Sequence, residues 1–419
     1  MKRPPKLLYR LIGNVVKLIK VKELGVKYIY KIDIKKIKGP FLLVSNHASR
    51  SDFVYTGFAF LPHVINFVVG HNEFYRSHLK GILGLLKAIP KKNFTPDVYA
   101  VKEILRILRE GGNVCIMPEG MSSISGENQP IALGTEKLIK KAGVPVYYTH
   151  IHGGYLSETK YCLDLRRGKT EVIIDRLFSA EEVASLSEKE IHDILEEKIY
   201  HDDYAYNKNA QVSFDGHGEI AKDMERLLYI CPTCGQKHVM KSDKNKLYCT
   251  VCGAGAEFDD KYNMTPLTEN SLLPESPSMW YRWQRQLVRA EIKANPDFTY
   301  SQKVKLGVLP EYKPLKNMET SIVVGEGELS LDKTGLRYQG TKNGEEFSFF
   351  LPIEQVPTYG MCTDVTRFYT FYNGEFLEFY PETNKVAEWF LTTEETHRAF
   401  GGKWQDFKWD KPVTLHKGK

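Results

Sequence analysis

The alternation of short apolar runs with helical patterns in the first half restricts the fold of this 419-residue chain more than any other feature. Residues 41–44 form one apolar run, and the runs at 114–117 and 144–148 each follow a helical pattern that ends in glycine. Strands that alternate with helices are typical of a largely parallel sheet covered by helices. We therefore expect an α/β domain with a mostly parallel sheet over residues 35–207.

Residues 1–34 are expected to form a basic amphipathic arm. This segment contains many lysines and only two acidic residues, Glu23 and Asp33. Apolar pairs recur every four positions in residues 5–20, which predicts a helix with one apolar face. A basic helix of this kind suits a membrane interface. The alternative is a helix packed on its own domain with its lysines in water.

No segment of the sequence predicts a membrane span or a secretory signal. The longest stretch without Asp, Glu, Lys or Arg, residues 53–72, contains Pro62 and Gly70, so we expect a buried helix and strand there. Seven cysteines include two CxxC pairs, which favours metal binding in a reducing compartment over disulfides. We expect a cytoplasmic protein that lies peripherally on the inner face of the membrane.

Two polar motifs directly follow predicted strands. Residues 45–52 read SNHASRSD, so that His47 precedes Asp52 by five positions. A carboxylate at this spacing can hold an imidazole in one tautomer and leave its other nitrogen to accept a proton. A His and an Asp that only cap a helix are the competing interpretation of this motif alone. The second motif, MPEGMSSISGE at residues 117–127, is rich in small residues that let a ligand approach the backbone.

These motifs, about 65 residues apart, resemble the HX4D and FPEGTRS blocks of the lysophosphatidic acid acyltransferase superfamily. The sequence AGVPV at residues 142–146 resembles the last block of that family, and the resemblance covers roughly residues 35–175. It implies transfer of an acyl group from acyl-CoA or acyl carrier protein to a hydroxyl of a lysolipid acceptor. His47 would act as general base, Asp52 would orient it, and Glu119 and Gly120 would bind the acceptor.

The sequence departs from the family pattern where phosphate recognition is expected. Met121, Ser122 and Ser123 stand where the family has Thr-Arg-Ser, and the arginine of the second block is also missing. Loss of a guanidinium fork weakens phosphate binding, so we expect weak selectivity for a phosphomonoester. The remaining candidates for acceptor binding are Ser122, Ser123, Lys91 and Lys92. Arg166 and Arg167 are a further source of charge, although solvated residues at a strand end are their simpler interpretation.

Two functional hypotheses from different classes follow. The first is a peripheral membrane O-acyltransferase; the absence of a G-x-S-x-G sequence disfavours a serine hydrolase. The second is a catalytically inactive acyltransferase fold that binds lipid or protein partners, motivated by Ser122 and by the segments that follow the domain.

Two CxxC-Gly knuckles, at residues 231–235 and 249–253, predict a zinc ribbon over residues 229–262. Four thiolates form a closed tetrahedral site, so the expected cofactor is a structural Zn²⁺, with a rubredoxin-type iron as the alternative. The expected ligands are Cys231, Cys234, Cys249 and Cys252. His238 is interpreted as a surface residue. We expect no nucleic-acid partner, because the ribbon offers few aromatic side chains for stacking.

The rest of the chain is expected to connect and extend these parts. The predicted segments are a connector at 208–228, a linker with one helix at 263–317 and an all-β barrel-like domain at 318–412. The order of strands and a closing helix resembles a PH or GRAM-type domain. Asn373-Gly374 between aromatic runs predicts a hairpin, and Thr392 with Glu395 predicts a capping box at the start of the last helix.

Overall fold

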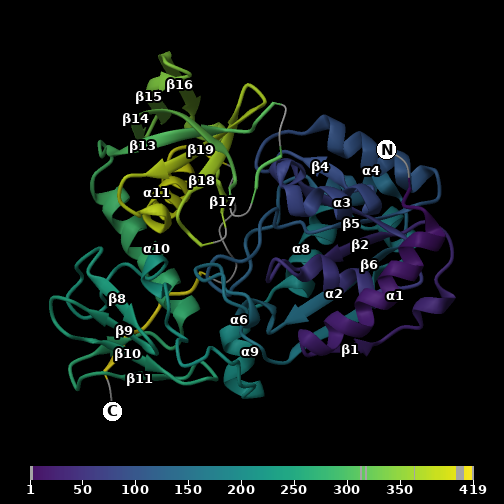
Figure 1. Cartoon of the computed structure of the whole chain (residues 1–419), viewed down its shortest axis with the longest axis horizontal. Coiled ribbons are helices and arrows are strands. Elements are labelled where there is room, and N and C mark those ends of the chain that lie inside the picture. The colour runs from purple at the N-terminus through teal and green to yellow at the C-terminus, as the bar shows by residue number, and fades with distance from the viewer. Residues whose placement is uncertain (1–2, 312–313, 317–318, 363, 403–409, 418–419) are drawn as a thin grey trace. The chain divides into compact units, whose positions relative to one another are not determined.

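The computed structural model describes residues 3–311, 314–316, 319–362, 364–402 and 410–417. The chain forms two compact units (Figure 1). The first contains Met1–Thr159 and Leu165–Phe214, and the second contains Lys160–Asp164 and Asp215–Lys419. The first two residues of the predicted arm and the predicted boundary between residues 317 and 318 lie outside the described residues.

A seven-stranded sheet with the order β1-β7-β6-β2-β5-β3-β4 forms the centre of the first unit. Its strands are β1 (Val26–Tyr30), β2 (Leu42–Ser45), β3 (Ile65–Gly70), β4 (Ile89–Lys91), β5 (Asn113–Ile116), β6 (Val146–His152) and β7 (Thr170–Phe178). The α/β class is confirmed, but the sheet is mixed, because β7 pairs antiparallel with β6 while the other pairs are parallel. No long crossover helix separates β6 from β7, and an antiparallel pair needs none.

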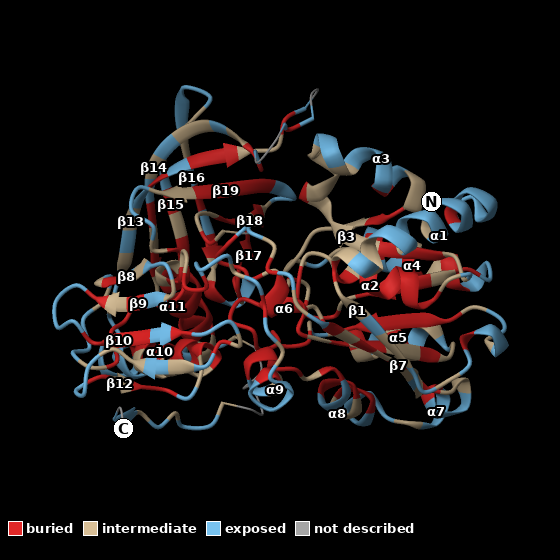
Figure 2. Cartoon of the chain, turned by 60° about the horizontal axis from the view of Figure 1, so that its bottom comes forward, coloured by how far each residue is buried: buried red, intermediate tan, exposed pale blue. Residues whose placement is uncertain are grey.

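Helices cover both faces of this sheet. They are α1 (Lys6–Glu23), α2 (Asp52–Ala59), α3 (Ser77–Leu86), α4 (Val98–Arg109), α5 (Thr135–Ala142), α6 (Gly154–Ser157), α7 (Ala180–Ser185), α8 (Glu188–Ile199) and α9 (Asp203–Ala210), with short 3₁₀ turns η1 (Ile34–Lys36) and η2 (His71–Tyr75). A buried apolar cluster joins β2 and β5 to α4, α5, α7 and α8. Figure 2 shows the buried residues concentrated in the strands and in the inner faces of the helices.

Helix α1 packs with its polar side toward the domain and leaves much of its apolar side in solvent. Arg10 Nε donates to the Pro62 carbonyl at 2.9 Å, and Lys17 Nζ donates to the Phe58 carbonyl at 3.0 Å. Leu7 and Leu18 are 84% and 81% exposed. The predicted amphipathic helix is therefore present, with an exposed apolar face. No helix among the described residues is long and apolar enough to span a membrane.

The second unit begins with a small antiparallel sheet of order β11-β10-β9-β8 that carries the cysteines. Its strands are β8 (Met240–Asp243), β9 (Lys246–Cys249), β10 (Gly255–Phe258) and β11 (Met264–Pro266); the 3₁₀ turn η3 (Met224–Arg226) precedes it, and β12 (Leu272–Leu273) pairs with β20 (His416–Lys417). Helix α10 (Pro277–Ala294) follows. Ser276 caps it through the Met279 amide, and proline occupies its first position, where the missing N–H costs nothing.

A curled half-barrel of seven antiparallel strands, with the order β16-β15-β14-β13-β19-β18-β17, completes the second unit. Its elements are β13 (Tyr300–Val308), β14 (Ile322–Asp332), β15 (Gly335–Lys342), β16 (Glu345–Pro352), η4 (Ile353–Gln355), β17 (Gly360–Met361), β18 (Phe368–Tyr372), β19 (Glu375–Pro381) and α11 (Val386–Ala399). The predicted hairpin at Asn373-Gly374 is confirmed. Strand β13, in the middle of the sheet, lies in the segment that was predicted to be a linker.

The predicted start of the last helix at Thr392 is wrong, because α11 begins six residues earlier at Val386. Trp389 and Phe390, in its first two turns, are fully buried, and this apolar burial explains why the helix extends beyond the local capping signal. Glu395 does not cap the helix; its carboxylate binds Arg285 and Arg289 of α10.

Candidate active site and metal centre

The two acyltransferase-like motifs meet at one edge of the first sheet. Strands β2, β5, β3 and β4 are parallel neighbours, so the segments that follow them lie at the same edge, where ligands bind in open α/β sheets. The His47 loop follows β2, and the loop 117–127 follows β5. The Ser123 amide donates to the His47 carbonyl at 2.7 Å, which joins the two loops directly.

His47 and Asp52 form the pair that their spacing predicts. Nδ1 of His47 lies 2.9 Å from Oδ2 of Asp52, and the His47 side chain is 22% exposed. Among the described residues no hydrogen bond is formed by Nε2 of His47. With a carboxylate on Nδ1, the proton resides there, and Nε2 presents its lone pair.

Asp52 is fully buried at the first position of α2 and is held by three donors. Besides His47, the Ser49 amide donates to Oδ2 and the Ser49 hydroxyl to Oδ1, each at 2.9 Å. Burial raises the pKa of Asp52 above its ordinary value, and the hydrogen bonds from His47 and Ser49 act against this shift. The carboxylate is thus fixed in one orientation relative to the imidazole.

Glu119 lies beneath the His47 loop and is completely buried. Its Oε1 accepts the His47 amide and its Oε2 accepts the Gln129 amide, both at 2.7 Å. Burial raises the pKa of Glu119, while these two hydrogen bonds act against the shift. Both carboxylate oxygens therefore bind backbone amides of the protein and fix the two motif loops relative to each other.

The remaining predicted residues of the second motif differ in accessibility. Ser123 is 1% exposed, and its hydroxyl donates to the Glu127 carbonyl at 2.6 Å and accepts the Gly126 amide at 2.9 Å. Ser122 is partly exposed. Gly120 has a positive φ of 74°, which favours glycine, and a methyl group built on it would lie 3.4 Å from the Phe94 ring. Of the two serines, only Ser122 is partly exposed.

Lys91 and Lys92 lie at the end of β4, at the same edge as His47. Three strand spacings separate β2 from β4, which corresponds to about 14 Å. Lys91 Nζ donates to the Lys92 carbonyl at 3.2 Å, and burial lowers the pKa of Lys91. The Lys92 amide donates to Asp97. Both lysines thus lie at the same edge of the sheet as His47, but not next to the His–Asp pair.

Several residues that support the pair were not predicted from the sequence. The Asn46 side chain donates to the Ile151 carbonyl at 2.9 Å and accepts the Ile151 amide at 2.7 Å, which joins the ends of β2 and β6. A methyl group on Gly154 would lie 3.2 Å from Ala48 Cβ and 3.6 Å from Asp52 Oδ1. The start of α6 therefore packs tightly against the His47 loop.

Two carboxylates with little solvent exposure also support the pair formed by His47 and Asp52. Asp203 is fully buried and accepts the Gly153 amide at 3.0 Å and the Tyr155 amide at 2.8 Å. Burial raises the pKa of Asp203 to about 7. Glu158 binds the loop before Asp52 through both oxygens, as described below. No local sequence signal marks either residue, because their partners are distant in sequence.

His150 and His152 lie on the opposite face of β6 from Ile151 and are partly buried, and His201, which follows α8, is buried. The rings of His150 and His152 are 4.1 Å apart, and His152 stacks on Tyr206 at 4.6 Å. His201 is 2% exposed, and neither of its ring nitrogens has a hydrogen-bond partner among the described residues. Burial lowers the pKa of all three, to about 3 for His201.

One minor expectation is corrected: Arg166 is 1% exposed and is therefore not a solvated residue at a strand end. His238 is exposed, as expected of a surface residue. Its Nε2 lies 2.8 Å from Oε2 of Glu388, and its ring stacks on Tyr229 at 4.8 Å.

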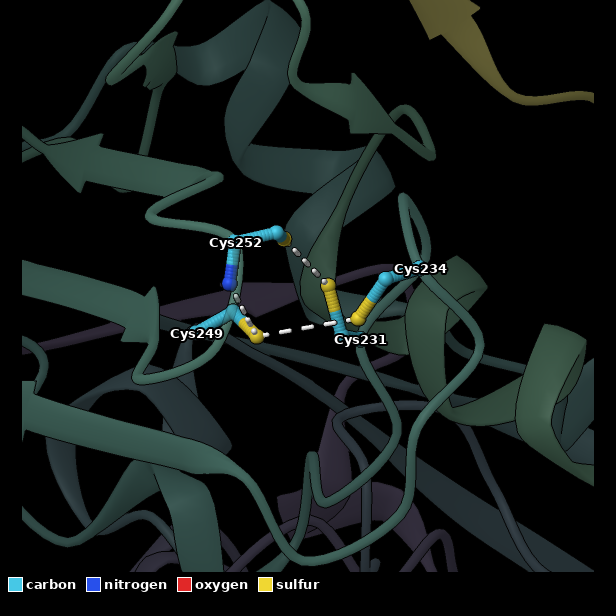
Figure 3. Close-up of side chains that lie close together, drawn as sticks. All are labelled: Cys231, Cys234, Cys249 and Cys252. Atoms are coloured by element: carbon cyan, nitrogen blue, oxygen red, sulfur yellow. Dashed lines mark hydrogen bonds between the residues drawn. The ribbon is translucent and has the colours of Figure 1, made fainter.

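The four predicted metal ligands come together in the second unit. Figure 3 shows the side chains of Cys231, Cys234, Cys249 and Cys252 pointing toward one another from two loops. Their sulfur atoms all lie within 4.8 Å; the pair Cys231–Cys252 is 3.6 Å apart and the pair Cys234–Cys249 is 3.8 Å apart.

This geometry fits a tetrahedral metal ion. Bonds of about 2.3 Å from zinc to sulfur place tetrahedral sulfur atoms about 3.8 Å apart. Each knuckle closes through a matching bond: the Gly235 amide donates to the Cys231 carbonyl, and the Gly253 amide to the Cys249 carbonyl. Both glycines have a φ of 73°, which explains why glycine follows each CxxC.

Comparisons with known proteins find similarity to acyltransferases. Residues 20–150 match the family described as Acyltransferase. A 1-acyl-sn-glycerol-3-phosphate acyltransferase of Bacillus subtilis (strain 168) is 23% identical over 183 residues, which are 44% of this chain and 88% of that protein. The solved structure of the 1-acyl-sn-glycerophosphate (LPA) acyltransferase from Thermotoga maritima matches with a TM-score of 0.39 and 19% identity, over 49% of this chain and 79% of that one.

The family match and the Bacillus relative make this part of the chain similar to acyltransferases. The matched residues 20–150 include both motifs. They begin before the predicted start of the domain at residue 35, within the basic arm.

Proposed function

We propose that the first unit transfers an acyl group from acyl-CoA or acyl carrier protein to a hydroxyl of a lysolipid, with His47 as general base and Asp52 as its orienting partner. The observation that carries this proposal is the 2.9 Å contact between Nδ1 of His47 and Oδ2 of buried Asp52. It leaves Nε2 as the proton acceptor in a partly exposed ring. The names of the similar proteins support a lysolipid acceptor.

The reaction needs no protein nucleophile. Nε2 of His47 takes the proton of the acceptor hydroxyl as its oxygen attacks the thioester carbonyl. The imidazolium that forms is stabilised by the Asp52 carboxylate. When the tetrahedral intermediate collapses, the carbon–sulfur bond breaks, and the departing thiolate receives the proton from His47. A positioned base of this kind contributes roughly 10²–10⁴-fold in rate.

Within this site we assign Glu119 to holding the loops, since both of its oxygens bind backbone amides. Gly120 leaves room beside the Phe94 ring, and Ser122 is the partly exposed serine of its motif. Lys91 and Lys92 supply positive charge at the same edge. The second motif contains no arginine in place of the missing one. We therefore propose that the site selects only weakly for acceptors that carry a phosphomonoester.

The exposed apolar side of helix α1 supports the proposal that the protein lies peripherally on the cytoplasmic face of a membrane. A helix that only packs on its own domain buries its apolar side, whereas α1 exposes Leu7, Leu11 and Leu18 by 84%, 62% and 81%. Its cations Arg10 and Lys17 bind carbonyls of the domain. We propose that the exposed apolar side lies in the lipid interface, next to the lysolipid acceptor.

For the second unit we propose a structural Zn²⁺ bound by the four cysteines, which supplies folding energy to the ribbon and takes no part in the reaction. Trp280 Nε1 donates to the Ile230 carbonyl at 2.9 Å, and the Ile230 amide donates to Gln284, so the first knuckle is attached to α10. The half-barrel with its closing helix α11 is proposed to be PH- or GRAM-like.

The proposal is tested by incubating the full chain with radiolabelled acyl-CoA or acyl carrier protein and vesicles that contain one lysolipid at a time. We expect a labelled diacyl lipid and one free thiol released per acyl group transferred. Vesicles without a lysolipid control for thioester hydrolysis. Absence of transfer to every acceptor, with a folded and metal-loaded protein, would favour the inactive, lipid-binding alternative.

A further inference from the structure

Glu158 binds the loop that connects His47 to Asp52. Its Oε2 accepts the Ser51 amide at 3.1 Å, and its Oε1 accepts Arg50 Nε at 3.2 Å. The Glu158 side chain is only 9% exposed. Hydrogen bonds to a charged and largely buried carboxylate are among the stronger ones in proteins.

The position of these contacts connects them to the geometry of the proposed base. Ser51 is the N-cap of α2, but its side chain makes no capping bond, and Asp52 is the first helical residue. The Ser51 amide also donates to the Ser49 hydroxyl at 3.3 Å, and Glu158 adds a carboxylate acceptor at this helix start, where negative charge is favourable. A shift at Ser51 moves Asp52, and with it the imidazole that Asp52 orients.

The backbone of Glu158 is fixed by the first unit on one side only. Its amide donates to the Gly154 and Tyr155 carbonyls of α6, each at 3.1 Å. After Thr159 the chain leaves the first unit. Residues Lys160–Asp164, which we call the crossing segment, belong to the second unit, and the chain returns at Leu165.

The crossing segment is bound within the second unit at both of its ends. The Asp364 amide donates to the Lys160 carbonyl at 2.8 Å, and Lys222 Nζ forms a 2.7 Å ion pair with Asp164. Between these contacts Tyr161 and Cys162 are 0% and 1% exposed. On the side of the first unit, the Arg166 amide donates to the Ser157 carbonyl at 2.8 Å, so the segment leaves and returns beside Glu158.

From these contacts we propose that Glu158 is a positioning residue of the acyl-transfer site, and that the crossing segment, held by the second unit, keeps it in place. Only Thr159 separates Glu158 from Lys160, so the two Cα atoms are at most about 7 Å apart. A displacement of the crossing segment by a few ångströms is therefore transmitted to the backbone of Glu158. The second unit thus supports catalysis through chain continuity. This inference rests on the proposed function for its kinetic consequence.

The positioning role is tested in the full chain with Glu158→Ala, Glu158→Gln and the control Glu197→Ala, which changes an exposed glutamate on α8. Loss of orientation lowers kcat, because even small misplacements of a catalytic group slow the reaction strongly. We expect kcat to fall about tenfold in Glu158→Ala, with KM within about twofold. Glu158→Gln keeps one acceptor for the Ser51 amide and should lose only about two- to threefold. A kcat of Glu158→Ala within twofold of the control overturns the role.

The contribution of the crossing segment is tested by inserting two glycines after Thr159. The matched control is the same insertion after Asp215, one residue beyond the second point at which the chain passes from the first unit to the second. The insertion after Thr159 should lower kcat about as much as Glu158→Ala and add little to it in the double variant, since both act through one contact. Equal kcat values for the two insertion variants overturn this part of the inference.

A readout that needs no activity separates failure of this inference from failure of the proposed function. Hydrogen–deuterium exchange of a peptide that covers residues 47–56 reports the Ser51 amide and the start of α2. Exchange should be faster in Glu158→Ala and in the Thr159 insertion than in their controls, even if no lysolipid is acylated. Unchanged exchange in both variants contradicts the inference whatever the activity.

Discussion

The four cysteines of the second unit lie within 22 residues of sequence, from Cys231 to Cys252, whereas the groups that support His47 and Asp52 extend from Asn46 to Asp203. Each cysteine knuckle closes on its own glycine, and the four side chains need only two loops. The His–Asp pair is also local, but its orientation depends on partners from the ends of several strands. Two sites with equally clear sequence motifs therefore differ in how much of the fold they require.

The largest effect is expected in the ribbon, where one ligand controls the site. Cys231→Ser should reduce the zinc content from one ion per chain to nearly none and unfold residues 229–258, since structural zinc contributes roughly 10–16 kcal/mol to the folding of such ribbons. Elemental analysis and hydrogen exchange measure both. Cys115→Ala, at a buried cysteine of the first unit, is the control that should keep the metal. A zinc-free wild-type protein with an ordered ribbon would contradict the assignment.

The next largest effect is expected at Asp52, the orienting partner of His47. Asp52→Asn should slow acyl transfer by about 10²–10⁴-fold, because an amide at this position donates to Nδ1 and removes the free base at Nε2. The melting temperature should change little, which distinguishes loss of orientation from loss of fold. Steady-state kinetics at saturating donor, together with thermal unfolding, provide the measurement. An Asp52→Asn rate within tenfold of wild type would show that the pair only caps α2.

Because it contains buried histidines, the first unit is expected to respond to acid differently from the ribbon. The pKa of His201 is about 3 in the folded chain and near 6.5 when unfolded. Between these values the unfolded state binds more protons, so the histidine lowers stability progressively as the pH falls from about 6.5 toward 3. Raised pKa values at Asp52 and Asp203 act in the opposite direction over part of this window.

Comparison with a variant isolates the histidine. His201→Phe should move the acid-unfolding midpoint of the first unit to lower pH by several tenths of a unit or more, because it removes the titrating group at similar volume. His217→Phe, at an exposed histidine, is the control and should leave the midpoint unchanged. Circular dichroism during acid titration follows the transition. Identical midpoints for both variants would contradict the effect of burial on His201.

The smallest effect of a substitution is expected on the selectivity for the lipid acceptor. Ser122→Arg introduces a guanidinium at the accessible position of the second motif, and a hydrogen bond between charged groups contributes about 1.5–3 kcal/mol. The preference for lysophosphatidate over neutral or diester lysolipids should therefore rise by roughly ten- to a hundredfold. Ser123→Arg is not a useful control because Ser123 is buried; Ser122→Gln tests size without charge. If wild type already prefers lysophosphatidate a hundredfold, Lys91 and Lys92 must provide the charge.

The features that the sequence predicted correctly are local in the chain. The knuckles, the His–Asp pair, the hairpin at Asn373-Gly374 and the apolar strands each depend on residues within a few positions of one another. The metal ligands converge as their spacing indicated.

Features that depend on distant partners could not be predicted. The role of Glu158 requires the fold to bring it to Ser51, 107 positions away. The reversed direction of β7 and the position of β13 in the half-barrel depend on strand pairing that has no local signal. The capping pattern at Thr392 was overruled by burial of Trp389 and Phe390 in the preceding turns.

The proposed role of His47 as the base for acyl transfer is tested most directly by a single-turnover measurement. The full chain, in excess over radiolabelled acyl-CoA, is mixed with lysolipid vesicles, and the rate of His47→Ala is compared with wild type and with His217→Ala. If His47 is the base, the rate should be at least about a hundredfold lower for His47→Ala, with unchanged folding and metal content, and His217→Ala should keep the wild-type rate. A His47→Ala rate equal to wild type would contradict it.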